Sequence, residues 1–256
     1  MITDNKRIKF LNTYIDNLNI NEVLIKIDEM VNDGLPHYIV TPNVDHIVKL
    51  ENDTEFKKVY EHADLILADG MTLIWISKLY GKPIKEKISG SDLVPEVCRI
   101  AAERGYSIFI LGGKARIAEK AKTNLENTYT GIRIVGTYSP KFGFEQDYEE
   151  LNKINHLIRI TKPNILLACL GCPRQEKFIY ENCDKYQANV SICAGATVDF
   201  LAGNIKRAPK WMSDAGFEWF YRFLQEPKRL FKRYFVDDIK IVKVAFKYRK
   251  RMDRLS

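Results

Sequence analysis

The stretch LILADGMTLIWISKLY, residues 65–80, holds the pattern that best indicates how this chain folds. Leu65 to Ala68 form an apolar run of strand length, and an apolar run of helical length begins at Met71. Asp69 and Gly70 stand between the two runs. Asp-Gly is a common turn pair, so it could simply end the strand. It could also hold a catalytic carboxylate at the mouth of an α/β sheet, and the rest of the chain has to separate these interpretations.

Apolar runs of strand length alternate with amphipathic stretches of helical length along most of the chain. The expected strands are residues 37–41, 65–68, 107–113, 132–138, 164–171 and 189–195. Continuous apolar strands that alternate with helices are typical of parallel sheets covered on both faces. We therefore predict a Rossmann-like α/β fold with a mostly parallel sheet. A small hairpin is expected at residues 8–18, and Ser91 is expected to cap the helix that runs to residue 105.

The composition limits the class of protein. The chain has 256 residues, of which 46% are hydrophobic, enough for one large domain or a domain with an appendage. No apolar run approaches the ~20 residues of a membrane-spanning helix, and the first residues lack the apolar core of a secretion signal. The five cysteines show no framework spacing. These features predict a cytoplasmic protein.

The positive charge is concentrated near the C-terminus. Residues 206–256 hold 15 Lys/Arg against 6 Asp/Glu, whereas residues 1–205 hold 25 against 27, and the basic segment also holds 11 of the 29 aromatic residues. We expect an α/β catalytic body at 1–205 and a basic, aromatic-rich helical tail at 206–256 that closes the site, binds membrane, or both. The apolar stripe of this tail favours the anionic inner face of the cell membrane over nucleic acid. The same stripe would also suit packing within a homo-oligomer, but we favour membrane association.

Small or polar residues follow five of the expected strands. Because ligands of open α/β sheets bind outside the carboxyl ends of the strands, these residues together predict a polar cleft. They are Thr41-Pro42-Asn43, Asp69-Gly70, Gly112-Gly113, the segment 171–176, and Gly195-Ala196-Thr197. Their agreement favours the catalytic interpretation of Asp69.

Several cofactor patterns are missing from the sequence. GxGxxG, GxxxxGK[ST], GxSxG, HExxH and Asp-x-Asp do not occur, and the four histidines lack metal-ligand spacing. We therefore predict no cofactor and no metal, and we expect helix amino-termini and Arg or Lys to bind any diphosphate. Arg222, Arg229 and Arg233 are spaced seven and four residues apart, which would place them on nearly one face of a helix. Cys169 and Cys172 form C-x-x-C, but Cys169 lies in an apolar run, which indicates a buried and inert thiol rather than a redox pair.

Seven short motifs of the chain together resemble those of a known protein family. TPN (41–43), ADG (68–70), GSDL (90–93), LGG (111–113), LGxPxQE (170–176), DxxxGxxKRAP (199–209) and EWxxRxxxEPxR (218–229) resemble, in order and spacing, the motif series of the WecG/TagA/CpsF glycosyltransferases. The resemblance covers roughly residues 8–235. It implies an inverting transferase that moves a sugar, often N-acetylmannosamine, from UDP to N-acetylglucosamine on a polyprenyl diphosphate lipid, in the synthesis of teichoic acid or other cell-surface polysaccharide.

The resemblance also implies site residues. Asp69 would be the catalytic base, Thr41 and Gln175 would contact substrate with Asn43 close by, and the arginines of the EWxxRxxxEPxR segment would close over the site and steady the departing diphosphate. The full set of expected substrate-binding residues is Thr41, Asn43, Gly70, Gly112, Gly113, Gln175, Arg207, Arg222, Arg229 and Arg233. Lys141 and Thr197 depart from the family pattern and put the donor sugar in doubt.

The sequence leaves some alternatives open. UDP-glucose or a UDP-N-acetylmannosaminuronic acid could be the donor. A sugar-nucleotide-binding protein without turnover, or a nucleic-acid-binding protein, would belong to a different class. Thr41 and Asn43 could serve only as helix caps.

Overall fold

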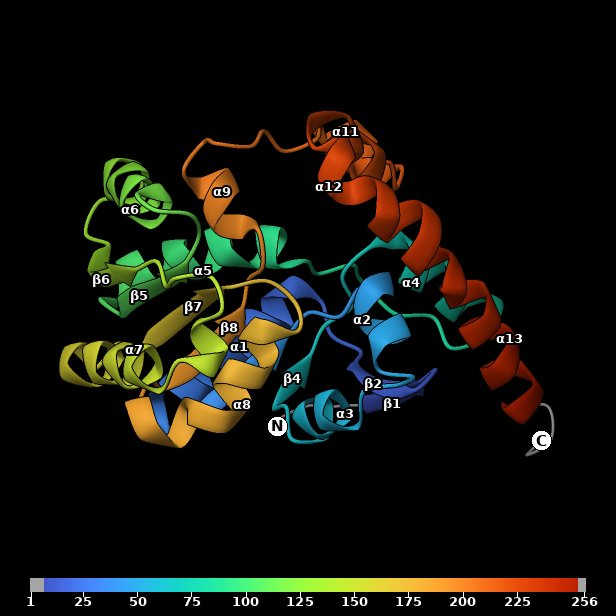
Figure 1. The fold of residues 1–256 in the computed structure, drawn as a ribbon, viewed down its shortest axis with the longest axis horizontal. Helices are drawn as coiled ribbons and strands as arrows, with labels where there is room; N and C mark the ends of the chain where they lie inside the picture. The colour runs from blue at the N-terminus through green and yellow to red at the C-terminus, as the bar shows by residue number, and fades with distance from the viewer. Residues whose placement is uncertain (1–6, 253–256) are drawn as a thin grey trace.

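The computed structural model describes residues 7–252, apart from the side chains of residues 210, 214 and 250–252. The outermost residues of the predicted body and tail, 1–6 and 253–256, lie outside the described residues. Figure 1 shows an α/β body from which the last helices extend across one side.

The central sheet has six strands, and all are parallel. They are β3 (His37–Val40), β4 (Leu65–Ile66), β5 (Ser107–Gly112), β6 (Arg133–Tyr138), β7 (Ile165–Cys169) and β8 (Val190–Cys193), in the order β4-β3-β8-β7-β5-β6. Strands β5, β7 and β8 are buried along their whole length, which explains why their sequences are continuously apolar. The predicted Rossmann-like parallel sheet is confirmed.

Helices cover both faces of the sheet and enclose two apolar cores (Figure 1). One core lies between the sheet and α1 (Ile20–Asn32), α5 (Gly90–Arg104), α6 (Ile117–Thr128) and α9 (Thr197–Leu201). The other lies under α2 (Val44–Lys49), α3 (Thr54–Glu61), α4 (Met71–Leu79), the short helix η1 (Phe144–Gln146), α7 (Tyr148–Thr161) and α8 (Arg174–Tyr186). Thus α2 leaves β3 on one face and α9 leaves β8 on the other, although β3 and β8 are neighbours. Such a divergence opens a place for a ligand at the carboxyl ends of the two strands.

The predicted N-terminal hairpin is confirmed as β1 (Arg7–Phe10) paired antiparallel with β2 (Thr13–Asp16). The Arg7 guanidinium donates to both carboxylate oxygens of Asp16 at 2.9 and 2.8 Å. Asp16 in turn accepts from the backbone N–H of Ile66 in β4 at 2.8 Å. The hairpin therefore covers the edge of the sheet next to β4, which otherwise would leave backbone groups unpaired.

The helix boundaries follow the capping signals with one correction. Asn19 caps α1 and Asp147 caps α7, both by accepting a backbone N–H three residues later. The expected cap at Ser91 is wrong, because α5 begins two residues earlier and Ser89 accepts from the N–H of Asp92. Ser89 and Asp92 form a reciprocal capping box, which stabilises this earlier start.

The C-terminal segment is helical and packs on the body. It comprises α10 (Lys210–Asp214), α11 (Glu218–Gln225), α12 (Pro227–Lys232), the π-helical turn η2 (Arg233–Asp237), the short helix η3 (Asp238–Lys240) and α13 (Ile241–Met252). Leu230, Ile241 and Val244 are buried, and the last two join one apolar core of the body. The Lys247 ammonium donates to Glu51 at 2.6 Å. Figure 1 shows α13 running diagonally past α4 and α2. No helix within residues 7–252 combines the length and the apolar character needed to cross a membrane.

Candidate active site

The ends of β3, β7 and β8 are joined by side-chain hydrogen bonds. The Thr41 hydroxyl, just after β3, donates to the carbonyl oxygen of Cys193 in β8 at 3.1 Å. The Gln175 side-chain oxygen accepts from the N–H of Gly171 at 3.2 Å and from that of Gly195 at 3.1 Å. Both side chains are buried. The structure thus brings Thr41 and Gln175 together at one sheet edge, where they shape the loops of that edge; their contact with substrate stays a prediction.

Asp69 lies at the same edge, directly after β4. Its backbone N–H donates to the carbonyl oxygen of Pro42 at 2.8 Å, which continues the pairing of β4 with β3 beyond the last strand residue. Its carboxylate accepts no hydrogen bond from the residues that the structure describes. Burial raises the pKa of this carboxyl group; Lys87 and His46 oppose the rise, and Glu218 and Asp92 add to it. A carboxylate that is fixed by its backbone, lacks a donor and has a raised pKa has the properties of a general base.

Cationic side chains face Asp69 from the body and from the C-terminal segment. Lys87 pairs with Asp92 at 2.8 Å and lies 3.6 Å from Glu218. Burial lowers the pKa of Lys87, but Asp92, Glu218 and Asp69 raise it overall, so this side chain stays charged. Arg233 donates to the Asn43 side-chain oxygen at 3.2 Å and interacts electrostatically with Asp69. Positive charge therefore acts on the Asp69 carboxylate both from the body and from the C-terminal segment.

Two arginines of the C-terminal segment keep an unused donor. The Nε groups of Arg222 and Arg233 are buried and have no hydrogen-bond partner among the described residues. The Arg222 guanidinium lies 5.5 Å from the centre of the Phe200 ring. The Tyr234 hydroxyl makes no hydrogen bond with the described residues. The charges of Arg222, Arg233 and Asp69 all act on its pKa. Buried guanidinium N–H groups without acceptors are suited to an anionic ligand.

The other predicted arginines lie differently. Arg207 donates to the carbonyl oxygen of Ser91 at 2.9 Å and to the Asp92 carboxylate at 2.5 Å, so it joins the C-terminal segment to the start of α5. Arg229 pairs with Glu226 and is more than half exposed. The expected single helical face for Arg222, Arg229 and Arg233 is wrong, because α11 ends at Gln225 and α12 begins at Pro227. Proline disfavours helical geometry in the residue before it, so the break follows from the Glu-Pro pair.

The predicted glycines have distinct environments. At Gly70 (φ +103°) a Cβ would meet no atom within 4 Å, so the backbone beside Asp69 is open to a ligand. At Gly112 (φ +120°) a Cβ would lie 2.2 Å from the carbonyl oxygen of Cys169. Gly113 (φ +78°) packs against Val198 and Ile117. Gly112 is therefore required by the close approach of β5 and β7, whether or not it also contacts substrate.

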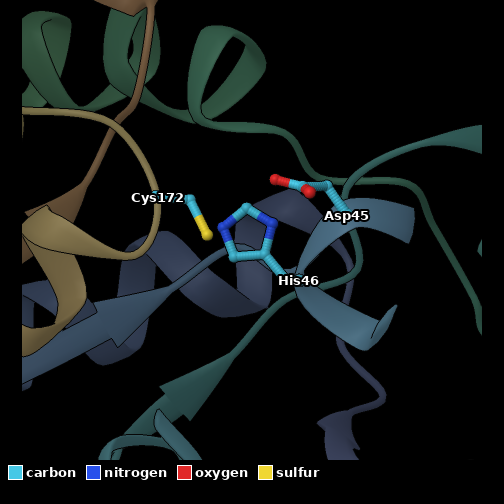
Figure 2. A group of neighbouring side chains, drawn as sticks. All are labelled: Asp45, His46 and Cys172. Atoms are coloured by element: carbon cyan, nitrogen blue, oxygen red, sulfur yellow. The ribbon is translucent and has the colours of Figure 1, made fainter. Parts of the chain in front are cut away.

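One group of potential metal ligands occurs within residues 7–252, formed by Asp45, His46 and Cys172. Figure 2 shows the Cys172 sulfur directed at the His46 ring, with Asp45 on the other side. Both His46 nitrogens already face acceptors, Asn43 at 2.8 Å and Glu176 at 3.2 Å. Asp45 pairs with Lys49. A metal ligand must offer a free lone pair, so these residues do not fit a metal site. Metal independence of the protein stays a prediction.

The C-x-x-C pair does not have the character of a redox site. Cys169 is buried in β7, and burial raises the pKa of its thiol to about 12. Burial also raises the pKa of Cys172, although His46 opposes the rise. A redox-active thiol needs a lowered pKa and access to solvent.

Sequence reasoning missed Lys87, His46 and Glu218 as neighbours of Asp69. Glu218 and Asp92 stand in motifs that the sequence analysis quoted, and Lys87 lies three residues before GSDL. His46 lies five residues after the start of TPN. Their meeting depends on the strand order, which places β3 between β4 and β8 and cannot be read from any one motif.

These features define the protein as an α/β enzyme whose candidate site combines one partly buried carboxylate with cationic groups suited to an anionic substrate. The model of the glycosyl transferase WecG/TagA/CpsF family matches residues 8–255. The chain belongs to this family of glycosyltransferases.

Two curated relatives carry the same name, N-acetylglucosaminyldiphosphoundecaprenol N-acetyl-beta-D-mannosaminyltransferase. The protein of Bacillus subtilis (strain 168) is 32% identical over 177 residues, which cover 69% of this chain and 67% of the relative. The protein of Bacillus spizizenii (strain ATCC 23059 / NRRL B-14472 / W23) is 30% identical over 192 residues, which cover 75% of this chain and 72% of the relative.

Proposed function

We propose that this glycosyltransferase moves N-acetylmannosamine from a UDP-sugar to N-acetylglucosamine on a polyprenyl diphosphate, with inversion at the anomeric carbon. The acceptor hydroxyl attacks that carbon, and Asp69 takes its proton as the new glycosidic bond forms. The bond between the anomeric carbon and the diphosphate oxygen breaks on the opposite face, and UDP leaves with the bonding electrons. An α-linked donor then gives a β-linked product.

The observation that carries the proposal is the state of Asp69. Its carboxylate lacks a hydrogen-bond donor among the described residues, it is held at the end of β4, and burial raises its pKa. A base used only in a structural turn would be expected to accept a hydrogen bond from nearby backbone. A raised pKa makes Asp69 a better proton acceptor for a sugar hydroxyl.

The departing diphosphate is handled by the cationic groups around Asp69. The unpartnered Nε groups of Arg222 and Arg233 and the ammonium of Lys87 are the candidates. Charge stabilisation by fixed donors in a partly buried site can replace protonation of the leaving group. Arg207 and Arg229 are predicted to bind substrate as well, but their described partners, Asp92 and Glu226, indicate that they help to position the C-terminal segment.

The names of the two relatives support the choice of N-acetylmannosamine as donor sugar and of an undecaprenyl-linked acceptor. Teichoic acid or related cell-wall polymer synthesis is the setting that fits such a product. These names do not favour UDP-glucose or a uronic acid as donor. Thr197, which departs from the expected family pattern, donates its hydroxyl to the carbonyl oxygen of Ala194 at 2.5 Å.

A panel of UDP-sugars, incubated with a short-chain polyprenyl diphosphate-N-acetylglucosamine, tests this proposal. We expect turnover with UDP-N-acetylmannosamine, and a loss of about a thousandfold or more in kcat for Asp69→Asn with UDP binding retained. If Asp69→Asn retains turnover, Asp69 is not the base, and its role is to form the turn after β4. Binding of UDP-sugar without turnover by the wild type would indicate the non-catalytic alternative. Loss of activity in EDTA, restored by magnesium, would overturn metal independence.

We also propose that the C-terminal segment holds the enzyme on the inner face of the cell membrane, where a polyprenyl-linked acceptor is found. Large apolar side chains are exposed along it, and its net charge is positive. These side chains include Trp211, Phe217, Trp219, Phe231, Phe235 and Phe246. Aromatic residues combined with Lys and Arg are typical of helices that lie in a membrane interface.

A further inference from the structure

A chain of hydrogen bonds links the strand ends of the body to Arg233. Gln175, which already accepts from the loops after β7 and β8, donates through its amide nitrogen to the Glu176 carboxylate at 2.7 Å. The same carboxylate oxygen lies 3.2 Å from Nε2 of His46, and Nδ1 of His46 lies 2.8 Å from the side-chain oxygen of Asn43. That oxygen accepts from Arg233 at 3.2 Å. His46 is thus the central link between the body and a cation that faces Asp69.

The hydrogen-bond geometry fixes the protonation of His46. The Asn43 oxygen also accepts from the backbone N–H of Asp45 at 3.1 Å. Because this N–H and the Arg233 guanidinium can only donate, the atom between them must be the amide oxygen. The backbone N–H of Asn43 also lies 3.4 Å from Nδ1, near the outer limit of a hydrogen bond. The contact of Nδ1 with the Asn43 oxygen is much shorter, at 2.8 Å, and an unprotonated Nδ1 would place two lone pairs against each other there. Nε2 faces a carboxylate in the same way, so both ring nitrogens donate and His46 is an imidazolium.

The ion pair of His46 and Glu176 lies in the interior. The exposed fraction of the His46 side chain is 7%, and that of Glu176 is 0%. Burying two charges carries a desolvation cost that their attraction often fails to recover. A merely structural cap for α2 would need only a neutral acceptor at Asn43. The charge on His46 is therefore more than helix capping requires.

The pair is well placed to control Arg233. The Asn43 oxygen receives its donors from α2 and from η2, so the orientation of this amide decides where the guanidinium can bind. Arg233 also lies 4.0 Å from Asp45 and 3.9 Å from Asp238, two carboxylates that could hold it elsewhere. A protonated Nδ1 keeps the Asn43 oxygen turned toward η2, because the reverse amide orientation would oppose an N–H with an NH₂ group.

We propose that His46 is a positioning residue: protonated and held by Glu176, it orients the Asn43 amide so that Arg233 lies beside Asp69. The inference rests on the proposed function, since it assigns Arg233 to the charge of the departing diphosphate. His46 itself does not touch the reacting atoms. Through its hydrogen bonds, it couples the positions of the β7 and β8 strand ends to the position of Arg233 in the C-terminal segment.

A double-mutant cycle tests the proposal in the full-length protein. His46→Gln and Arg233→Gln are made singly and together, and kcat and KM for the UDP-sugar are measured with the thermal midpoint of each variant. We expect His46→Gln to lower kcat by about tenfold to a hundredfold, as for other misplaced catalytic groups. In the double variant the loss should equal that of Arg233→Gln alone, because His46 acts through Arg233. Losses that multiply would overturn the proposal.

Two further variants separate positioning from structural support. Glu176→Gln keeps an oxygen for His46 but removes the charge that protonates it, so a smaller kcat loss with the same non-additivity is expected; this variant carries the test if His46→Gln does not fold. His62→Gln is the matched control, because His62 is exposed and its ring contacts the Lys58 carbonyl oxygen and the Tyr180 ring rather than Asn43 or Arg233. A lowered thermal midpoint with unchanged kcat in both test variants would reduce His46 to a structural cap.

Hydrogen exchange provides a readout that does not depend on turnover. If His46 holds Arg233, amides of residues 226–240 should exchange faster in His46→Gln than in His62→Gln, in the absence of substrate. Unchanged exchange there would overturn the proposal even if the enzyme is active. Absence of transfer by the wild type with every donor would instead contradict the proposed function, while faster exchange would still support the coupling.

Discussion

At the scale of single residues, the environment of Asp69 makes a prediction about pH. Burial raises the pKa of this carboxyl group above its ordinary 3.8, Lys87 opposes the rise, and Glu218 adds to it. Because the base must be deprotonated, kcat should fall as the pH drops through this raised pKa. Removing Lys87 (Lys87→Met) should move the acid limb of the kcat profile to higher pH, and removing the charge of Glu218 (Glu218→Gln) should move it lower.

The measurement is kcat against pH under saturating donor for the wild type and both variants. The two variants control for each other, because they should shift the acid limb in opposite directions. General damage to the site would lower kcat but would not shift the limb to higher pH in one variant and to lower pH in the other. Shifts of the same sign in both variants would mean that another group controls the acid limb.

Gly112 makes a prediction about stability. Its φ of +120° and the 2.2 Å gap from an added Cβ to the Cys169 carbonyl oxygen leave no room for a side chain. Gly112→Ala should lower the free energy of unfolding by about 2–4 kcal/mol, from backbone strain and overpacking together. Gly143→Ala is the control, because Gly143 has φ +82° but open space, so it carries the backbone term alone. Denaturant unfolding checks both, and equal losses would contradict the packing argument.

Single residues also show how far the sequence could lead. Asp69 and Asn43 were predicted as site residues from their motifs and Arg233 from the spacing of arginines in the basic tail, and the structure brings the three to one edge. Gln175 was predicted there too, but its side-chain oxygen is occupied by two backbone N–H groups. Lys87 and His46 could not be predicted, because a lysine or a histidine outside a motif has many ordinary explanations. Only the order of the strands, which is non-consecutive, shows what these side chains face.

At the scale of elements, continuous apolar runs predicted the strands well, since a strand buried on both faces has to be apolar throughout. The strand at 65–68 is shorter than expected, with only Leu65 and Ile66 in β4, yet backbone bonds continue the pairing through Leu67 and Asp69. The C-terminal segment was harder to predict. Its apolar residues recur at helical spacing, but Pro227 divides the helices, and this changes which arginines share a face.

The docking of the last helices should depend on pH through Asp238. Burial raises the pKa of this carboxyl group to about 6, with Arg233 and Lys49 opposing the rise and Asp45 and Asp237 adding to it. The folded protein therefore binds this proton more tightly than the unfolded chain, whose pKa is near 3.8. The stabilising contribution is fully present below about pH 3.8 and is lost as the pH rises through about 6.

Asp238→Asn should therefore raise the thermal midpoint at pH 8 and leave it nearly unchanged at pH 4. Hydrogen exchange of residues 233–248 at the two pH values localises the effect to the docked segment. Asp237→Asn is the neighbouring control, because the bond from Lys240 lowers the pKa of Asp237 and its removal should not stabilise. If Asp238→Asn raised the thermal midpoint equally at pH 4 and pH 8, the ionisation of Asp238 would not be the cause of the stabilisation.

At the scale of the whole molecule, the two proposals concern the same segment. The C-terminal helices present buried cations that act on Asp69, and they also carry exposed aromatic side chains. An enzyme of this shape would meet the membrane with the face that completes its active site. A lipid-linked acceptor could then reach the base without leaving the bilayer surface, which is why one segment would serve both attachment and catalysis.

This arrangement predicts how the protein binds vesicles. Binding should require an anionic lipid such as phosphatidylglycerol and should weaken as salt rises, because the charge of the segment is screened. Replacing Trp211 and Phe231, whose exposed fractions are 70% and 57%, by Ser should each weaken binding roughly tenfold, from the lost burial of an aromatic ring in lipid. Ile25→Ser is the control, since Ile25 is equally exposed, at 61%, but lies on α1 of the body.

Co-sedimentation with vesicles, at two salt concentrations, measures these affinities. The same variants should retain turnover on a short-chain acceptor in solution, because neither aromatic residue faces Asp69 in the described contacts. Equal weakening by Ile25→Ser would mean that the body binds lipid without orientation. Binding to neutral vesicles or to oligonucleotides with the same affinity would contradict an anionic bilayer as the partner. The exposed aromatic residues would then be candidates for an interface between copies of the chain.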